Sequence, residues 1–80
     1  MKNRICVIGI LVENRKIAAE INQVLSDFGE IVVGRLGVPY RERKLSIISI
    51  IVDGTTDQIG ALTGKLGQIK EVKVKSAILI

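Results

Sequence analysis

The residue types that most often carry enzyme chemistry are scarce in this 80-residue sequence. It has no histidine and a single cysteine, Cys6, which lies inside an apolar run and therefore has the setting of a packing residue rather than a nucleophile. The four serines have no histidine partner, and the eight Asp and Glu residues stand one by one along the chain. We therefore expect no enzymatic activity, no metal site and no cofactor.

Arg35 is the first candidate for binding. It lies between Gly34 and Gly37 at the end of a predicted strand, where glycine lets a small ligand approach the backbone. Its guanidinium group could hold a carboxylate. A β-bulge with a solvated arginine explains the same residues, and we favour that explanation.

A charged segment after Pro39 is the second candidate. Arg41, Arg43 and Lys44 surround Glu42, and the chain has a net charge of +4, so this segment could contact the phosphates of a nucleic acid. A lone basic cluster without aromatic stacking platforms is more often a solvated loop. Nucleic-acid binding through this segment is therefore the alternative function.

Three glycines, Gly60, Gly64 and Gly67, recur in a predicted helix. A phosphate-binding loop needs its glycines before a helix and a Lys-Ser/Thr pair after them, whereas Lys65 is followed by Leu66 near a helix end. Glycine inside a helix costs about 1 kcal/mol relative to alanine. We therefore expect this helix to pack closely on the sheet or on a neighbouring molecule.

Hydrophobic periodicity predicts the elements that must position these residues. β-Branched apolar runs predict strands at Arg4–Val12 and at residues 31–36, 45–52 and 71–80. Apolar residues at spacings of three and four predict two helices, the first capped by Asn14 and the second by a capping box of Thr55 and Gln58. Residues 37–43 are expected to form a loop because Pro39 cannot donate to a sheet, and residues 53–54 a turn.

The predicted order, βαββαβ, is that of an α+β ferredoxin-like fold, a four-stranded antiparallel sheet with both helices on one face. Residues 1–80 form a single domain. The first and third strands are the most apolar and are placed in the centre, while Arg35, Lys73 and Lys75 mark the edge strands. Residues 45–52, LSIISIIV, are apolar on both faces. The face that the helices leave open should therefore be covered by another copy, in a dimer or tetramer.

Several segments resemble one small family. They are VGRLGVPYRE (residues 33–42), ALTGKLGQI (61–69) and VKVK (72–75), together with VENR (12–15) and SII (46–48). They resemble the iron-only hydrogenase system regulator family of the ACT-like superfamily, and the likeness covers nearly the whole chain. The chain is also similar to the C-terminal domain of the nickel-responsive repressor, which binds nickel through histidines and a cysteine. Nickel sensing is not expected here because the chain has no histidine.

The resemblance implies an ACT-like domain that oligomerises through its sheet. ACT domains often bind amino acids between the loop after the first strand and a neighbouring subunit. By position, the resemblance places Glu13, Asn14 and Arg15, with Arg35 and Gly37, along such a ligand site.

These observations predict a small homo-oligomeric regulatory or sensor domain, a regulator of an iron-only hydrogenase system, acting through a small ligand or a protein partner. No apolar stretch is long enough to cross a membrane, and the single cysteine fits a reducing compartment. We therefore expect a cytoplasmic protein without membrane contact.

Overall fold

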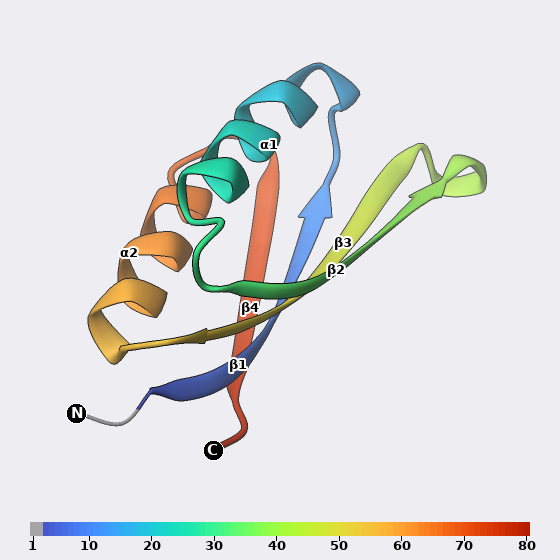
Figure 1. Ribbon diagram of the computed structural model, residues 1–80. Helices are drawn as coiled ribbons and strands as arrows, with labels where there is room; N and C mark the ends of the chain where they lie inside the picture. Colours follow the sequence, from blue (N-terminus) through green and yellow to red (C-terminus); the bar gives the residue numbers. More distant parts are fainter. Residues whose placement is uncertain (1–2) are drawn as a thin grey trace.

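The computed structural model describes residues 3–80 and has the predicted order of strands and helices (Figure 1). The structure also contains two short 3₁₀ turns, η1 and η2, which the sequence analysis did not predict. In chain order the elements are β1 (Arg4–Val12), η1 (Arg15–Ile17), α1 (Ala18–Asp27), β2 (Val32–Tyr40), η2 (Arg41–Arg43), β3 (Leu45–Gly54), α2 (Thr56–Gly67) and β4 (Val72–Ile78).

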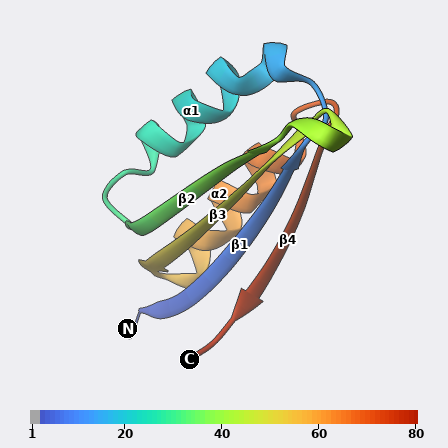
Figure 2. The same cartoon turned by 90° about the vertical axis from the view of Figure 1, so that its right-hand side faces the viewer.

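The four strands form one antiparallel sheet in the order β2-β3-β1-β4. Both helices cover the same face of this sheet, as the two views of the ribbon show (Figures 1 and 2). The ferredoxin-like α+β fold is thereby confirmed, with the two most apolar strands in the centre. Arg35, Lys73 and Lys75 lie on the edge strands β2 and β4, as predicted.

The core lies between the helices and one face of the sheet. Side chains alternate along β1, so Cys6, Ile8, Ile10 and Val12 are buried while their neighbours are only half-buried. The same alternation along β3 buries alternate residues in its second half. The helices complete the core with one apolar stripe each, made of Ile21 and Leu25 from α1 and Ile59, Leu62 and Leu66 from α2.

The beginnings of both helices follow their capping residues. The Asn14 side chain accepts a hydrogen bond from the Lys16 amide at 2.9 Å, which caps the 3₁₀ turn η1 that precedes α1. At α2, the Thr55 hydroxyl oxygen accepts from the Gln58 amide at 3.1 Å, and the Gln58 side-chain oxygen accepts from the Thr55 amide at 2.9 Å. The predicted capping box is therefore present.

The predicted loop at residues 37–43 is wrong over residues 37–40, while residues 41–43 form the connecting turn η2. Strand β2 continues through Gly37 and Pro39 to Tyr40, and Pro39 stands opposite Ser46 of β3. Proline is tolerated here because β2 is an edge strand and its outer side needs no amide donor. The hairpin thus extends as a long arm to η2, visible at the far end of β2 and β3 in Figure 1.

Smaller differences concern strand ends. Strand β3 includes the predicted turn at residues 53–54, because Asp53 and Gly54 pair with Ile5 and Arg4 of β1. The Asp53 amide also donates to the Ile31 carbonyl oxygen at 2.8 Å. Strand β4 is shorter than predicted, although the Leu79 amide still donates to the Ile5 carbonyl oxygen at 2.8 Å. The register of β2 shifts between Val32 and Gly34, so the bulge that we favoured beside Arg35 is present.

The expected close packing of the glycines of α2 on the sheet is also wrong. A Cβ atom added at Gly60, Gly64 or Gly67 would meet no atom of this chain within 4 Å. These positions are exposed, because the residues that face the core are Ile59, Leu62 and Leu66. Their packing on a neighbouring molecule stays a prediction.

The face of the sheet opposite the helices is uncovered and apolar. It is formed by those alternate residues of the central strands β1 and β3 whose side chains point away from the helices, and by the residues of β2 that share this face. Leu36, Val38, Ile47 and Ile51 are 64, 43, 42 and 43% exposed. Lys73 and Lys75 lie at its β4 edge, opposite Leu11 and Gly9 of β1. We call this surface the open face.

Candidate functional site

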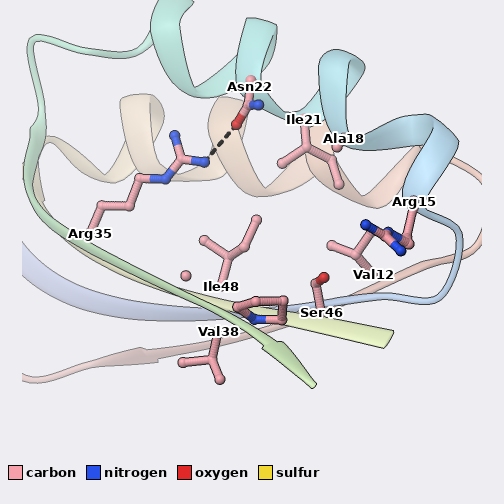
Figure 3. Close-up of a pocket in the computed structure, with 11 residues that line it drawn as sticks. Val12, Arg15, Ala18, Ile21, Asn22, Arg35, Val38, Ser46 and Ile48 are labelled. Carbon is pink, nitrogen blue, oxygen red and sulfur yellow. Dashed lines mark hydrogen bonds between the residues drawn. The ribbon is translucent and has the colours of Figure 1, made fainter. Parts of the chain in front are cut away.

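A cavity of about 450 Å³ lies between α1 and the β2–β3 hairpin (Figure 3). It is on the face of the sheet that carries the helices, near the end of β1 and the turn η1. The hairpin arm forms one wall, and α1 with η1 forms the other (Figure 3). The extension of β2 past Pro39 is what gives this cavity its outer wall.

Four polar side chains border the cavity, each from a different element. Arg15 comes from η1, Asn22 from α1, Arg35 from β2 and Ser46 from β3. Arg35 stands opposite the buried Ile50 of β3, so it points to the helix side and donates a hydrogen bond to the Asn22 side-chain oxygen at 2.5 Å (Figure 3). This bond joins the sheet edge to α1 across one end of the cavity.

The remaining surface of the cavity is mostly apolar. The Ile48 side chain points up from β3 toward α1, and Ile21 and Ala18 approach from the helix (Figure 3). Val38 belongs to the lining, but its side chain points to the other side of the ribbon, into the open face (Figure 3). The cavity therefore combines an apolar interior with cationic groups at its rim, an arrangement typical of sites for small organic molecules.

The structure brings together three of the five predicted ligand residues. Arg15, Arg35 and Gly37 line the same cavity. Glu13 does not, because its carboxylate lies 3.7 Å from the Lys73 amino group, on the open-face side of the sheet. Asn14 does not line it either, because its side chain caps η1. Ligand binding by these residues stays a prediction.

The sequence did not indicate Asn22, Ser46 or Pro39 as lining residues. Asn22 directly follows Ile21, a core residue of α1. Its position at the border of the apolar stripe is the sequence feature that could have indicated a place beside the sheet. Ser46 and Pro39 could be found only by knowing that β2 and β3 remain paired out to Tyr40 and Leu45.

A second cavity of about 490 Å³ adjoins the first at the hairpin end. Its lining includes Arg15, Pro39 and Ser46 again, with Arg41, Lys44 and Leu45 in addition. Lys44 adopts a left-handed conformation, with φ of 54°, that ends η2 and turns the chain into β3.

The structure separates the predicted nucleic-acid residues. Arg41 and Lys44 line the second cavity, on the side of the helices. Arg43 borders a smaller hollow with Leu11, Tyr40 and Ile47, residues of the open face. Arg41 also borders a hollow with Tyr40 and Glu42. Arg43 thus lies by a different hollow from Arg41 and Lys44, and Glu42 stands among them.

The part of the chain that the structure describes lacks two other kinds of site, a cluster of metal ligands and a membrane-spanning helix. Among residues 3–80, no three side chains of His, Cys, Asp or Glu are grouped so that they could hold a metal ion. None of the helices in that range has both the length and the hydropathy needed to span a membrane.

This chain is similar to one protein family and to a solved structure. The chain matches the TM1266-like family model, described as "Iron-only hydrogenase system regulator, putative", over residues 4–76. The solved structure of the uncharacterized protein TM1266 from Thermotoga maritima is 38% identical, with a TM-score of 0.93 over 99% of this chain and 100% of that one. No curated protein matches.

A more distant structural likeness concerns the fold alone. CPII from Thiomonas intermedia K12, solved with ADP, AMP and acetate bound, is 16% identical, with a TM-score of 0.56 over 100% of this chain and 92% of that one. The family model, in contrast, spans nearly every element from β1 to β4. This chain therefore belongs to the TM1266-like family of iron-only hydrogenase system regulators.

Proposed function

We propose that this chain is a homo-oligomeric regulatory domain that assembles through the open face of its sheet and responds to a small ligand in the cavity beside α1. The observation that carries the proposal is the row of exposed aliphatic side chains on the open face, among them Leu36, Ile47 and Ile51. Exposed apolar patches of this kind are typical of interaction surfaces in small soluble domains.

The size of the open face is sufficient for a small interface. Four strands of seven to ten residues, spaced about 4.8 Å apart with a rise of about 3.3 Å per residue, give a surface of roughly 19 by 25 Å. Two such faces stacked together would bury on the order of 1,000 Å², which is about the minimum area for a biological interface and is typical of a weak one. A dimer or tetramer of this chain is the occupant that the proposal favours, because Lys73 and Lys75 would stay solvated at the rim.

The ligand part of the proposal is supported by the convergence of four elements on one cavity. Polar groups from η1, α1, β2 and β3 surround an apolar interior whose volume of about 450 Å³ lies within the usual range for ligand sites. A protein partner that docks on the hairpin arm is the other route by which the domain could signal. Cytoplasmic localisation is proposed on the ground of the single, buried Cys6.

Light scattering after size-exclusion chromatography tests the assembly. We expect a mass that is a multiple of 8.7 kDa at about 50 µM protein, a concentration above the Kd of a micromolar complex. A stable mass of one chain at that concentration would refute the assembly through the open face.

The nucleic-acid alternative has less support from the geometry. Arg43 lies apart from Arg41 and Lys44, so the three residues do not form one surface that could follow a phosphate backbone. A gel-shift experiment at low salt tests it: a shift that weakens steeply with added salt would restore this alternative, and no shift would remove it.

A further inference from the structure

We infer that the two cavities beside the hairpin form one elongated site for a small organic anion with a negatively charged group at each end. The inference rests on the proposed function, because it names the class of ligand to which the regulatory domain would respond.

The first step is the continuity of the two cavities. Arg15, Pro39 and Ser46 line both of them, so the space beside α1 continues along the hairpin toward η2. One end is bordered by Arg35 and the other by Arg41 and Lys44. Arg35 and Arg41 are six residues apart along the extended hairpin arm, about 20 Å at a rise of about 3.3 Å per residue. A small ligand would therefore contact Arg15 together with the cation of one cavity, such as Arg35, rather than both ends at once.

The second step is the charge of the lining. Arg15, Arg35, Arg41 and Lys44 border the combined site, whereas no Asp or Glu lines either cavity. Within residues 3–80 the ion pair between Glu13 and Lys73 is the only one, so none of these four cations has an acidic partner there. Glu42 is the acidic residue nearest to them in the lining of the hollows, and it shares a neighbouring one with Pro39 and Arg41. An excess of cations makes the site attractive to an anion with more than one negative charge.

The third step is the distribution of polar groups along the site. At one end Arg35 is held by Asn22, which fixes the guanidinium and leaves the Asn22 amide nitrogen available to donate. The middle of the combined site holds Arg15 and Ser46 beside Pro39, because these three residues line both cavities. Within the first cavity, Ile48 and Ala18 offer apolar surface in addition to Arg15 and Arg35. A ligand with two anionic ends and a short carbon chain matches the pair Arg15 and Arg35 with this apolar surface, whereas inorganic phosphate has no carbon chain to use it.

The same geometry argues for a small molecule rather than a polymer. The site is bounded by α1 and η1 on one side and by the hairpin on the other, as the close-up shows for its first half (Figure 3). Arg43, which a nucleic acid would need, borders a different hollow.

Isothermal titration calorimetry on the full chain tests the inference at constant ionic strength. The probes are glutarate, a dicarboxylate, and 3-phosphoglycerate, a phosphorylated acid, which separate the two chemical sources of a dianion. Butyrate is the control with one charge, and inorganic phosphate the control without a carbon chain. We expect at least one dianion to bind about tenfold or more tightly than both controls, because its two anionic groups form charge-assisted hydrogen bonds with Arg15 and Arg35.

Two variants and a matched control locate the binding. Arg15→Gln and Arg35→Gln should each weaken binding of the tighter dianion by about tenfold or more, since each removes one of the two cations that line the first cavity. Arg43→Gln removes the same charge from the end of the hairpin arm, where Arg43 lines neither cavity, and should change affinity less than about twofold. Circular dichroism of each variant verifies that the fold is retained.

Three results would overturn the inference. Absence of binding by both dianions at about 10 mM, or equal affinity for butyrate, would exclude a dianion site of useful strength. An equal loss in Arg43→Gln would indicate general attraction to positive charge. Displacement of the dianion by a single-stranded oligonucleotide, with the same loss in Arg43→Gln, would favour nucleic-acid binding instead.

Failure of this inference can be distinguished from failure of the proposed assembly. Light scattering on the same samples reports the mass independently of any ligand. An oligomer that binds neither dianion overturns the ligand class alone, whereas a monomer that binds a dianion at Arg15 and Arg35 overturns the assembly alone.

Discussion

Replacing Ile47 with aspartate is the sharpest perturbation of the proposed assembly. Ile47 lies on the central strand β3, between Val38 of β2 and Leu11 of β1, and 42% of its surface is exposed on the open face. Fully burying an isoleucine is worth about 1.5–3 kcal/mol, so covering the remaining 42% contributes roughly 0.6–1.3 kcal/mol in each copy. A two-fold interface contains this contact twice, which gives roughly 1.3–2.5 kcal/mol.

The aspartate adds the cost of removing a carboxylate from water, several kcal/mol for each copy. A total loss of about 4 kcal/mol or more corresponds to roughly a thousandfold weaker association. Ile47→Asp should therefore elute as a folded chain of 8.7 kDa at about 50 µM, where the wild type is assembled. Light scattering gives the mass, and circular dichroism verifies that the substitution leaves the fold intact.

Ile78→Asp is the matched control. Ile78 is an exposed isoleucine of the same sheet, at 49%, but it stands opposite Cys6 and so belongs to the helix side rather than the open face. It should keep the wild-type mass. If Ile47→Asp keeps the assembled mass, or if Ile78→Asp dissociates and Ile47→Asp does not, the open face is not the interface and the reasoning from exposed area is wrong.

Three further predictions concern stability, each measured by thermal unfolding at a fixed protein concentration, where 1 kcal/mol shifts the Tm of a domain this size by about 4–8 °C. Gly60→Ala and Gly64→Ala should each stabilise by up to about 1 kcal/mol, because the new methyl group meets no atom of this chain; a loss of the assembled mass would instead show that α2 packs on a neighbour. Glu71→Gly should stabilise by roughly 0.5–1 kcal/mol, since Glu71 has φ of 64° and glycine adopts this conformation without strain; an unchanged or lower Tm would contradict this. Thr55→Ala should destabilise by about 1 kcal/mol through loss of the hydroxyl that accepts from the Gln58 amide, and a Tm equal to that of the wild type would show that water replaces the cap.

The order of elements and the sheet arrangement could be predicted because they depend on local patterns. The alternation along β1, the apolar stripes of the helices and the box of Thr55 and Gln58 each act over a few residues. The course of β2 through Pro39 was missed, although the same patterns placed this strand at the edge of the sheet, where proline is tolerated. Local patterns do not show how far the pairing of two strands continues, and here it reaches Tyr40 opposite Leu45.

The candidate site was only partly predictable for a related reason. Arg15, Arg35 and Gly37 could be proposed from residue type and position, and they line one cavity. Asn22 and Ser46 look like an ordinary helix-surface asparagine and a strand serine until the hairpin arm is placed beside α1. Glu13 lies away from this cavity because the strand alternation that buries Val12 turns the next side chain to the opposite face, where it meets Lys73.

The alternation of β3 has a thermodynamic consequence for the two proposals. Ser46 and Ile48 line the cavity, while Ile47 between them lies on the open face, so one stretch of backbone separates the two surfaces. If a bound anion changes the free energy of assembly, linkage requires that assembly change the affinity for the anion by the same factor. Titrations of the anion at protein concentrations below and above the association midpoint would give its affinity for the monomer and for the oligomer. The ratio of these two affinities is the coupling constant, whether assembly strengthens or weakens binding.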